Sequence, residues 1–158
     1  MEKVKTLKLR EATQKHIPEI IELLTALYLE LGEEQKSVQF LTNQLLIDVL
    51  NSGKTKIYLI KEDRLIIGIV TLTESYAIYS GGPYGSIDEM YIHHAFRGKG
   101  IGRWAIGELK HIGRARRWKR IDVTAPTDEK WIQTVKFYES CGFLFTGPKF
   151  KLELDGVL

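Results

Sequence analysis

The sequence predicts a mixed α/β fold in which helices pack around one sheet. Two observations support this class. Apolar residues recur at three- and four-residue steps over residues 17–31, and beyond residue 53 the pattern changes to strand-like runs rich in Ile, Val, Leu, Thr and Tyr. The first of these strands follow one another directly, whereas the later ones alternate with helices. The predicted order is β-α-α-β-β-β-α-β-α-β-β, in a single domain covering residues 1–158.

The composition is that of a globular chain. Its 158 residues are 44% hydrophobic and 27% charged, which allows a sizeable core. The formal net charge of +3 permits an anionic ligand without demanding nucleic acid. The single cysteine, Cys141, cannot form an intramolecular disulfide, and residues 1–5 do not resemble a signal peptide. The apolar runs are too short to span a bilayer, so we expect a cytoplasmic domain with no membrane partner.

The N-terminal elements are a short strand and two helices. Residues 7–10 alternate apolar and polar, which is typical of a strand. A long helix follows, with Pro18 in its first turn and Gly32 at its C-terminal stop. Ser37 is the predicted cap of a second helix, which ends at residues 51–53.

The middle of the chain is predicted to form a hairpin, a loop and a further strand. Residues 56–61 and 65–76 are the hairpin strands, and residues 62–64 are the turn between them. Residues 79–85 are rich in Gly and Tyr and contain Pro83, which predicts a loop, and residues 87–93 predict the next strand.

The C-terminal elements alternate in type. They are a helix at 103–118, a strand at 121–125, a helix ending near 141, and strands at 143–145 and 149–154. Thr127 or Asp128 would cap the second of these helices, and Gly142 would stop it.

A glycine-rich turn, Arg97-Gly98-Lys99-Gly100-Ile101-Gly102, lies between a predicted strand and a predicted helix. Glycines let backbone N–H groups approach a ligand closely, and a helix N-terminus carries partial positive charge. With the charges of Arg97 and Lys99, the turn predicts an anion site suited to pyrophosphate. The alternative is a tight basic connection. Arg103 stands where a Rossmann motif needs glycine, and the Gly-Lys-Ser/Thr end of a P-loop does not occur.

Two segments resemble a known family. The stretch from Ile87 to Gly102, which contains the pattern Arg-x-x-Gly-x-Gly, is similar to the acetyl-CoA motif of the Gcn5-related N-acetyltransferase (GNAT) superfamily. The segment from Phe137 to Phe143 resembles that family's Tyr-x-x-x-Gly-Phe signature. Both occur in the family's order and spacing. The resemblance implies the GNAT fold and an N-acetyltransferase that uses acetyl-CoA.

The resemblance also implies roles for particular residues. Backbone groups around Met90, Tyr91 and Ile92 would pair with the pantetheine arm of acetyl-CoA. The pyrophosphate would be held by amides of the turn residues Arg97, Gly98, Lys99, Gly100, Ile101 and Gly102. Tyr138 would lie near the thioester sulfur. Many relatives carry Asn where this chain has Trp131, so the contact made by that Asn is not expected here.

Acetyl transfer requires a base and an acid, and two residues are the main candidates. Glu89 lies where this family often carries a base, and it would deprotonate the ammonium directly or through water. Tyr138 would protonate the leaving thiolate. In a regular strand Asp88 points away from the face of Glu89, whereas a bulge would change that parity. His93 is the alternative base. Glu89 could instead be a solvated strand carboxylate, and Tyr138 could simply pack the last helix.

Other reactive side chains are assigned no chemistry. Cys141 lies near a helix C-terminus, where the dipole disfavours a thiolate, so a structural thiol is expected instead of an acyl-enzyme nucleophile. The histidines show no metal-ligand spacing, so no metal is predicted.

The basic run over residues 114–120 has two interpretations. It could bind nucleic acid, or it could be the solvated end of a helix, and the modest net charge favours the second. Acceptor-site candidates are acidic and tyrosine side chains that would suit a cationic amine. They are Tyr28, Glu30, Glu33, Glu34, Tyr76, Tyr79 and Tyr84.

We therefore predict an enzyme that moves acetyl from acetyl-CoA to a primary amine by direct attack, most simply on a small molecule. The alternatives are a non-catalytic acyl-CoA sensor and a nucleic-acid-binding module that uses Arg114–Arg120. A homodimer formed through the last strand is left open, and the acceptor and the acyl chain length are not specified by the sequence.

Overall fold

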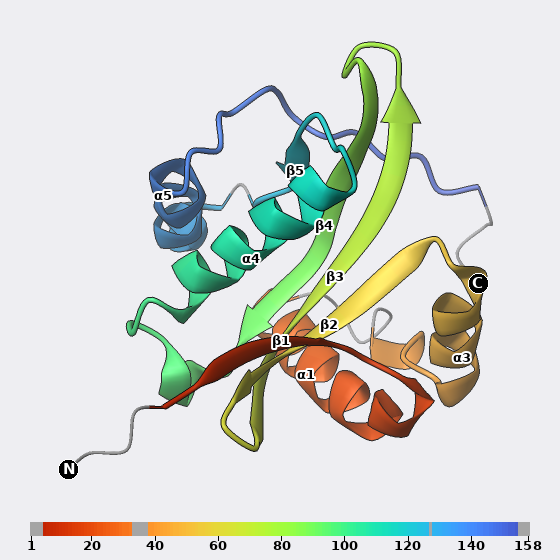
Figure 1. Cartoon of the computed structure of the whole chain (residues 1–158), viewed down its shortest axis with the longest axis vertical. Coiled ribbons are helices and arrows are strands. Elements are labelled where there is room, and N and C mark those ends of the chain that lie inside the picture. Colours follow the sequence, from red (N-terminus) through yellow and green to blue (C-terminus); the bar gives the residue numbers. More distant parts are fainter. Residues whose placement is uncertain (1–4, 33–37, 127, 155–158) are drawn as a thin grey trace. The chain divides into compact units, whose positions relative to one another are not determined.

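The computed structural model describes residues 5–32, 38–126 and 128–154 of the chain (Figure 1). The chain divides into two compact parts, Met1–Val123 and Thr124–Leu158.

The first part is built around a five-stranded mixed sheet with the order β1-β2-β3-β4-β5. Its strands are β1 Leu7–Glu11, β2 Thr55–Glu62, β3 Leu65–Ala77, β4 Gly82–Ile92 and β5 Ile121–Val123. The first four strands pair antiparallel, and β5 pairs parallel to β4. The predicted mixed α/β class and the hairpin of β2 and β3 are confirmed.

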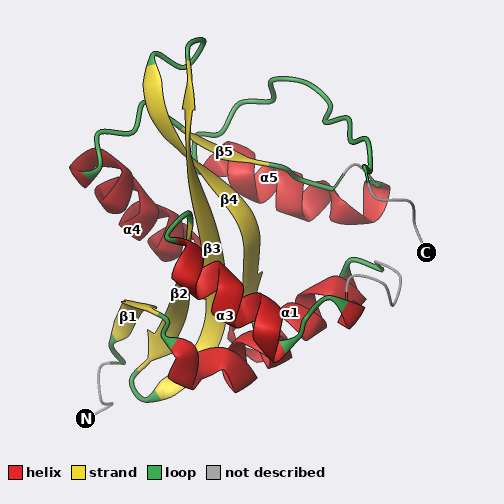
Figure 2. Cartoon of the chain, turned by 90° about the vertical axis from the view of Figure 1, so that its right-hand side faces the viewer, coloured by secondary structure: helices red, strands yellow, loops and turns green. Residues whose placement is uncertain are grey.

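Helices cover both faces of this sheet. The helices α1 (Ile17–Glu30) and α3 (Asn43–Ser52) lie on one face, and α4 (Ile101–Ala115) lies on the other (Figure 2). As predicted, α1 carries Pro18 in its first turn. The cap predicted at Ser37 lies outside the described residues, and the helix α3 is capped by Thr42, whose hydroxyl accepts from the Leu45 N–H at 3.1 Å.

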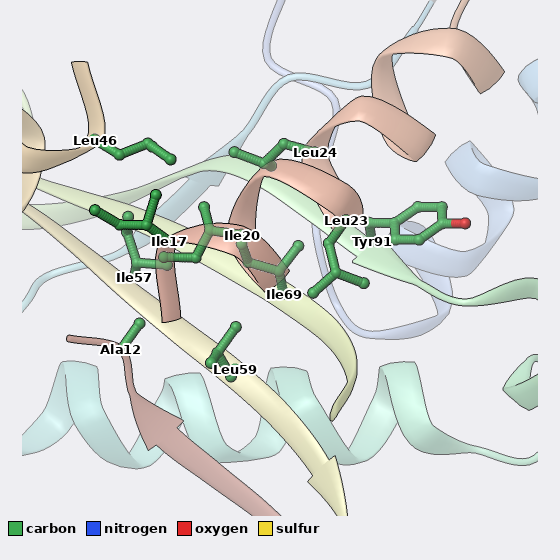
Figure 3. Packing of buried hydrophobic residues seen from close by; sticks show 10 residues of the cluster. All are labelled: Ala12, Ile17, Ile20, Leu23, Leu24, Leu46, Ile57, Leu59, Ile69 and Tyr91. Carbon is green, nitrogen blue, oxygen red and sulfur yellow. The ribbon is translucent and has the colours of Figure 1, made fainter. Parts of the chain in front are cut away.

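The main core lies between α1, α3 and the sheet. Figure 3 shows this cluster, to which α1 contributes Ile20 and Leu24 and the sheet contributes Ile57, Leu59 and Ile69. Ile20 and Ile69 are completely buried. Complete burial of such a side chain stabilises the fold by about 1.5–3 kcal/mol, so α1 is firmly attached to the face of the sheet on which the candidate site is built.

Strand β4 begins at Gly82 and not at Ile87, so the loop prediction for residues 82–85 was wrong. Gly85 pairs with both β3 and β5, and its lack of a side chain leaves room for the Trp118 ring. A Cβ built on Gly85 would lie 2.1 Å from that ring. Glycine here is therefore required by close packing, which composition alone does not distinguish from a loop.

Helix α4 is shorter at its C-terminus than predicted. It ends at Ala115 because Arg117 adopts a left-handed conformation, with φ of 61°. The Trp118 N–H then donates to the Gly113 carbonyl at 2.8 Å, which is the helix-ending pattern of a Schellman motif. This turn directs Trp118 back onto the sheet.

The second part contains α5 (Ile132–Ser140), preceded by a 3-10 turn at Glu129–Trp131. Gly142, with φ of 96°, ends the helix as predicted. Of the two caps considered, Thr127 lies outside the described residues, and Asp128 makes no side-chain capping bond.

The strands predicted at residues 143–145 and 149–154 are not formed in the described residues. Instead, five large apolar side chains are mostly exposed there: Leu144, Phe145, Phe150, Leu152 and Leu154. An alternating pattern creates a strand only where a neighbouring strand supplies hydrogen bonds, and no ladder reaches this segment.

Replacing Gly85 with Ala should destabilise the chain by about 1–3 kcal/mol because the added methyl overlaps the Trp118 ring. Urea denaturation followed by tryptophan fluorescence measures this. Gly107→Ala is the matched control, since a Cβ there meets nothing within 4 Å and should be neutral or stabilising. Equal stability of the two variants would contradict the packing described.

Candidate active site

A β-bulge in β4 places two carboxylates on one face of the sheet. Thr71 pairs with Glu89, but the next residue of β3, Leu72, pairs with Ile87, so Asp88 is the extra residue. The side chain of Asp88 accepts a hydrogen bond from Thr73, and that of Glu89 accepts one from Thr71. Because the two threonines lie two residues apart on β3, they share a face. The strand is therefore not regular here, and the bulge that the sequence left open as an alternative changes the parity of Asp88.

Glu89 is held by two side chains. Its Oε1 accepts from the Tyr28 hydroxyl of α1 at 2.9 Å, and its Oε2 accepts from the buried Thr71 hydroxyl. The Glu89 N–H also donates to the Thr71 oxygen at 2.9 Å. The half-buried carboxylate is thus oriented on the α1 face of the sheet. Tyr28 was predicted as a wall of the acceptor site, and its contact with Glu89 was not foreseen.

His93, the alternative base, has a structural contact. It lies at the end of β4, where its Nδ1 accepts from the Ala95 N–H at 3.2 Å and caps the 3-10 turn His94–Phe96. Its ring stacks on the ring of His94, with centroids 4.3 Å apart. These contacts orient the ring as a cap.

The glycine turn opens toward the N-terminus of α4. Gly98 and Gly100 have φ of 73° and 78°, and a Cβ built on either would meet nothing within 4 Å. Glycine is therefore required here by the left-handed backbone and not by protein packing. The N–H of Trp104 makes a helical bond to the Gly100 carbonyl at 3.0 Å, and the N–H groups before it belong to the helix end. This geometry suits an anion.

The side chain of Arg97 is bound within the protein. Its Nη1 and Nη2 donate to the two carboxylate oxygens of Glu30 at 2.7 and 2.8 Å, and its Nε donates to the Ile92 carbonyl at 2.8 Å. The hydrogen bond from Arg97 lowers the pKa of Glu30, and the same bond raises the pKa of Arg97. The guanidinium charge that the sequence assigned to an anionic ligand is therefore largely neutralised by Glu30.

Lys99 and the amide of Arg97 also have partners inside the chain. The Lys99 ammonium lies 3.4 Å from the Ala95 carbonyl and 5.5 Å from the centre of the Phe96 ring. The Arg97 N–H donates to the His94 carbonyl at 3.3 Å. The amides from Gly98 onward are consequently better placed for a ligand than that of Arg97.

The edge of β4 beyond the bulge is the predicted site for the pantetheine arm. The parallel ladder between β4 and β5 ends at the pair Ile87 and Val123, so β5 does not continue alongside Met90–Ile92. Tyr91 is buried in the core, whereas Met90 and Ile92 are half-buried. On the β3 side the strands approach closely, since a Cβ on Gly68 would lie 2.6 Å from the Tyr91 carbonyl.

Tyr138 belongs to α5 in the second part of the chain. Its ring packs between those of Phe137 and Phe143, with centroid distances of 5.2 and 5.4 Å. Burial raises the pKa of Tyr138 to about 12, with a smaller contribution from Cys141. At neutral pH the phenol therefore keeps its proton. Trp131, which replaces the Asn of many relatives, precedes the same helix and is half-buried.

The basic run is partly neutralised by acidic neighbours. Arg116 donates to Glu74 at 2.8 Å, and Arg120 forms an ion pair with Asp122 at 2.9 Å. The guanidinium of Arg120 also lies 4.8 Å from the centre of the Tyr79 ring. These contacts account for two of the arginines without a nucleic acid.

The remaining acceptor-site candidates are dispersed. Glu33 and Glu34 lie outside the described residues. Tyr76 and Tyr79 are exposed near the tip of the hairpin between β3 and β4, and the hydroxyl of Tyr79 lies 3.5 Å from that of Tyr84. Among the candidates that the structure describes, Tyr28 is the one whose hydrogen bond with Glu89 is seen.

Neither a metal-binding cluster nor a membrane-spanning helix is found in the part of the chain that the structure describes. Among these residues there is no group of three or more His, Cys, Asp or Glu side chains that could hold a metal ion. None of the described helices combines the length and apolar character that a membrane crossing requires.

Comparison with known proteins identifies the family. The model of the acetyltransferase (GNAT) family matches residues 17–143, which include the bulge, the glycine turn and Tyr138. The chain belongs to the GNAT family. The predicted resemblance is confirmed, and membership supports acetyl transfer as the general activity of this GNAT protein. A search of the curated proteins found no match.

Solved structures of low sequence identity share the fold. A ribosomal-protein-alanine N-acetyltransferase from Brucella melitensis biovar Abortus 2308 is 19% identical, with a TM-score of 0.75 over 95% of this chain and 100% of that one. An aminoglycoside acetyltransferase from an uncultured soil metagenomic sample is 18% identical, with a TM-score of 0.79 over 95% and 99%. A transcriptional regulator from Bacillus halodurans C-125 is 20% identical, with a TM-score of 0.77 over 94% and 100%.

The raised pKa of Tyr138 predicts an unusual alkaline titration. Between pH 10 and about 12 an unfolded chain loses this proton while the folded chain keeps it, so folding stability should fall over that range as the pH rises. Urea unfolding of wild type and Tyr138→Phe at several alkaline pH values measures the effect. Wild type should lose stability more steeply than the variant. Parallel pH dependences would show that Tyr138 titrates normally.

Proposed function

We propose that this GNAT protein is a cytoplasmic N-acetyltransferase that moves acetyl from acetyl-CoA to a primary amine by direct attack. The observation that carries this proposal is the open glycine turn, in which two left-handed glycines present the N-terminus of α4 to solvent. Amides of Gly98, Lys99, Gly100, Ile101 and Gly102 would hold the pyrophosphate. When bound, acetyl-CoA would supply the acetyl group as an activated thioester.

Backbone groups of β4 would provide the next contacts. Backbone groups at the edge formed by Met90, Tyr91 and Ile92 would hydrogen-bond to the pantetheine arm, in the way that a sheet edge binds an additional strand. A backbone N–H near Met90 or Tyr91 would donate to the negative charge that develops on the carbonyl oxygen.

Glu89 is the proposed base. The Glu89 carboxylate first takes one proton from the ammonium, directly or through water, so that a neutral amine can attack. The amine nitrogen then forms a bond to the acetyl carbon, the carbon–sulfur bond breaks, and the second proton lost from nitrogen passes to solvent, from which the thiolate is protonated. Hydrogen bonds from Tyr28 and Thr71 orient this carboxylate. Asp88, on the same face, adds a negative charge that favours a cationic acceptor.

Tyr138 is better suited to hydrogen bonding than to complete proton donation. Transfer from a phenol with pKa about 12 to a thiolate whose parent thiol has pKa about 8.5 costs about 5 kcal/mol. A hydrogen bond from the phenol would still stabilise charge developing on sulfur. In this proposal Tyr138 donates that bond, and solvent supplies the final proton.

A small-molecule amine is the proposed acceptor. The carboxylates on the α1 face support a cationic acceptor, and one structurally similar protein is an aminoglycoside acetyltransferase. A second similar protein is an N-acetyltransferase of ribosomal-protein alanine, so a protein amine is the other member of the same chemical class. Whether the enzyme acts as a homodimer stays an open prediction.

The cofactor site is tested by calorimetric titration with acetyl-CoA. Wild type should bind with micromolar affinity, and Gly100→Glu should abolish binding because it strains the turn and places a negative charge beside the phosphates. Gly107→Glu adds the same charge to the middle of α4 and should bind like wild type. Failure of wild type to bind acetyl-CoA would overturn the proposal.

The base is tested by thiol release with a panel of amines. Glu89→Gln should lower kcat about 100-fold or more with little change in acetyl-CoA affinity. Asp88→Asn is the matched control from the same bulge, and it should mainly raise the KM of cationic amines. A larger loss of kcat in Asp88→Asn would reverse the two roles. Binding without thiol release for any amine would indicate an acyl-CoA sensor.

A further inference from the structure

The last turn of α1 contacts two separate parts of the candidate site. Tyr28 donates to Glu89, the proposed base, at 2.9 Å. Two residues later, the carboxylate of Glu30 accepts hydrogen bonds from both terminal nitrogens of Arg97, which is the first residue of the glycine turn. One helical turn therefore joins the base and the proposed phosphate site, although neither segment is near α1 in the sequence.

Arg97 is fixed from three directions. Besides the bidentate pair with Glu30, its Nε donates to the Ile92 carbonyl at the end of β4, and its guanidinium lies 5.2 Å from the centre of the Tyr91 ring. A planar guanidinium held by a fork-to-fork pair and a third hydrogen bond has a defined orientation. These contacts tie together the end of α1, the end of β4 and the start of the turn.

The glycine turn has few anchors of its own. Its two left-handed residues, Gly98 and Gly100, carry no side chain, and the space where a Cβ would lie is empty to 4 Å. Apart from the contacts of Lys99 with Ala95 and Phe96, the position of the turn therefore depends on the residues that flank it. On the N-terminal side that residue is Arg97, and on the C-terminal side it is Ile101, which is buried.

We propose that Glu30 is a positioning residue for the cofactor. Through Arg97, Glu30 attaches the glycine turn to the last turn of α1, which also carries Tyr28, the hydrogen-bond partner of Glu89. This keeps the distance and orientation between the phosphate site and the base fixed. This inference rests on the proposed function. In this arrangement Arg97 is not a phosphate ligand. Its guanidinium stays paired with Glu30 when the cofactor binds, so Glu30 and the phosphates do not compete for it.

The test compares two acetyl donors, acetyl-CoA and S-acetylpantetheine, which has the thioester and the pantetheine arm but no phosphates. Glu30→Gln should weaken acetyl-CoA binding about fivefold and lower kcat at saturating acetyl-CoA, since the thioester is no longer held in register with Glu89. Its kcat/KM with S-acetylpantetheine should equal that of wild type, because the turn does not anchor that donor.

Arg97 variants separate positioning from phosphate binding. Arg97→Gln should reproduce Glu30→Gln, and the double variant should be no worse than Arg97→Gln alone. Arg97→Lys should also be impaired, because lysine keeps the charge but loses the fork. If Arg97 is instead a phosphate ligand, Arg97→Lys will bind acetyl-CoA like wild type, and Glu30→Gln will bind it equally or more tightly. Either result overturns the inference.

A matched ion pair controls for general loss of stability. Arg116 and Glu74 form an Arg–Glu pair at 2.8 Å, with side-chain exposures of 45% and 30%, close to the 40% and 35% of Arg97 and Glu30. Arg116 directly follows the last residue of α4, and Glu74 lies on the sheet face opposite Glu89. Glu74→Gln should leave the kinetics of both donors unchanged. Equal effects of Glu74→Gln and Glu30→Gln on acetyl-CoA would show that Glu30 acts through stability alone.

Amide hydrogen exchange of the ligand-free protein gives a readout without activity. Glu30→Gln should speed exchange at Gly98–Gly102 relative to wild type, whereas Glu74→Gln should not. Unchanged exchange in Glu30→Gln would overturn the inference. Failure of the proposed function would give a different result from failure of the Glu30 inference, because wild type itself would then not bind acetyl-CoA or release thiol. A functional wild type with an unaffected Glu30→Gln variant contradicts the positioning role alone.

Discussion

The extra residue in β4 is the constraint on which the candidate site depends. By inserting Asp88 opposite the junction of Thr71 and Leu72, the bulge brings both carboxylates to the face covered by α1. A bulge also bends a strand and increases its twist, and the ladder with β5 ends directly before it, at Ile87. The same local irregularity therefore orients the proposed base and leaves the strand edge that the pantetheine arm would use.

The charge distribution around the glycine turn indicates how an anion would be held. Arg97 is paired with Glu30, so its charge is largely cancelled, and Lys99 lies over Phe96. The attraction left to the turn comes mainly from oriented backbone amides and the dipole of α4, which are most effective at short range. Such a site would select for a phosphate that fits the turn closely, and it would depend on the turn being held in place.

Similarity of fold supports acetyl transfer less strongly than the geometry of the candidate site does. Structures below 25% identity that share this fold include two acetyltransferases and a transcriptional regulator. A fold places functional groups but does not specify the reaction. The family match, together with the geometry of Glu89 and the glycine turn, gives the stronger support for acetyl transfer.

The sequence alone determined the features that depend on the local backbone. Helical periodicity predicted α1, and the glycines predicted a turn before α4. The left-handed backbone of Gly98 and Gly100 agrees with that turn, because glycine adopts this conformation freely. Only the tertiary structure decided features that depend on distant partners. Asp88 lies on the same sheet face as Glu89 because β3 imposes the register, and the guanidinium of Arg97 binds Glu30, 67 residues away. Likewise, residues 143–145 and 149–154 have the apolar pattern of strands but do not form strands. A strand needs hydrogen bonds from a neighbouring strand, and the sequence of the segment itself does not show whether such a neighbour is present.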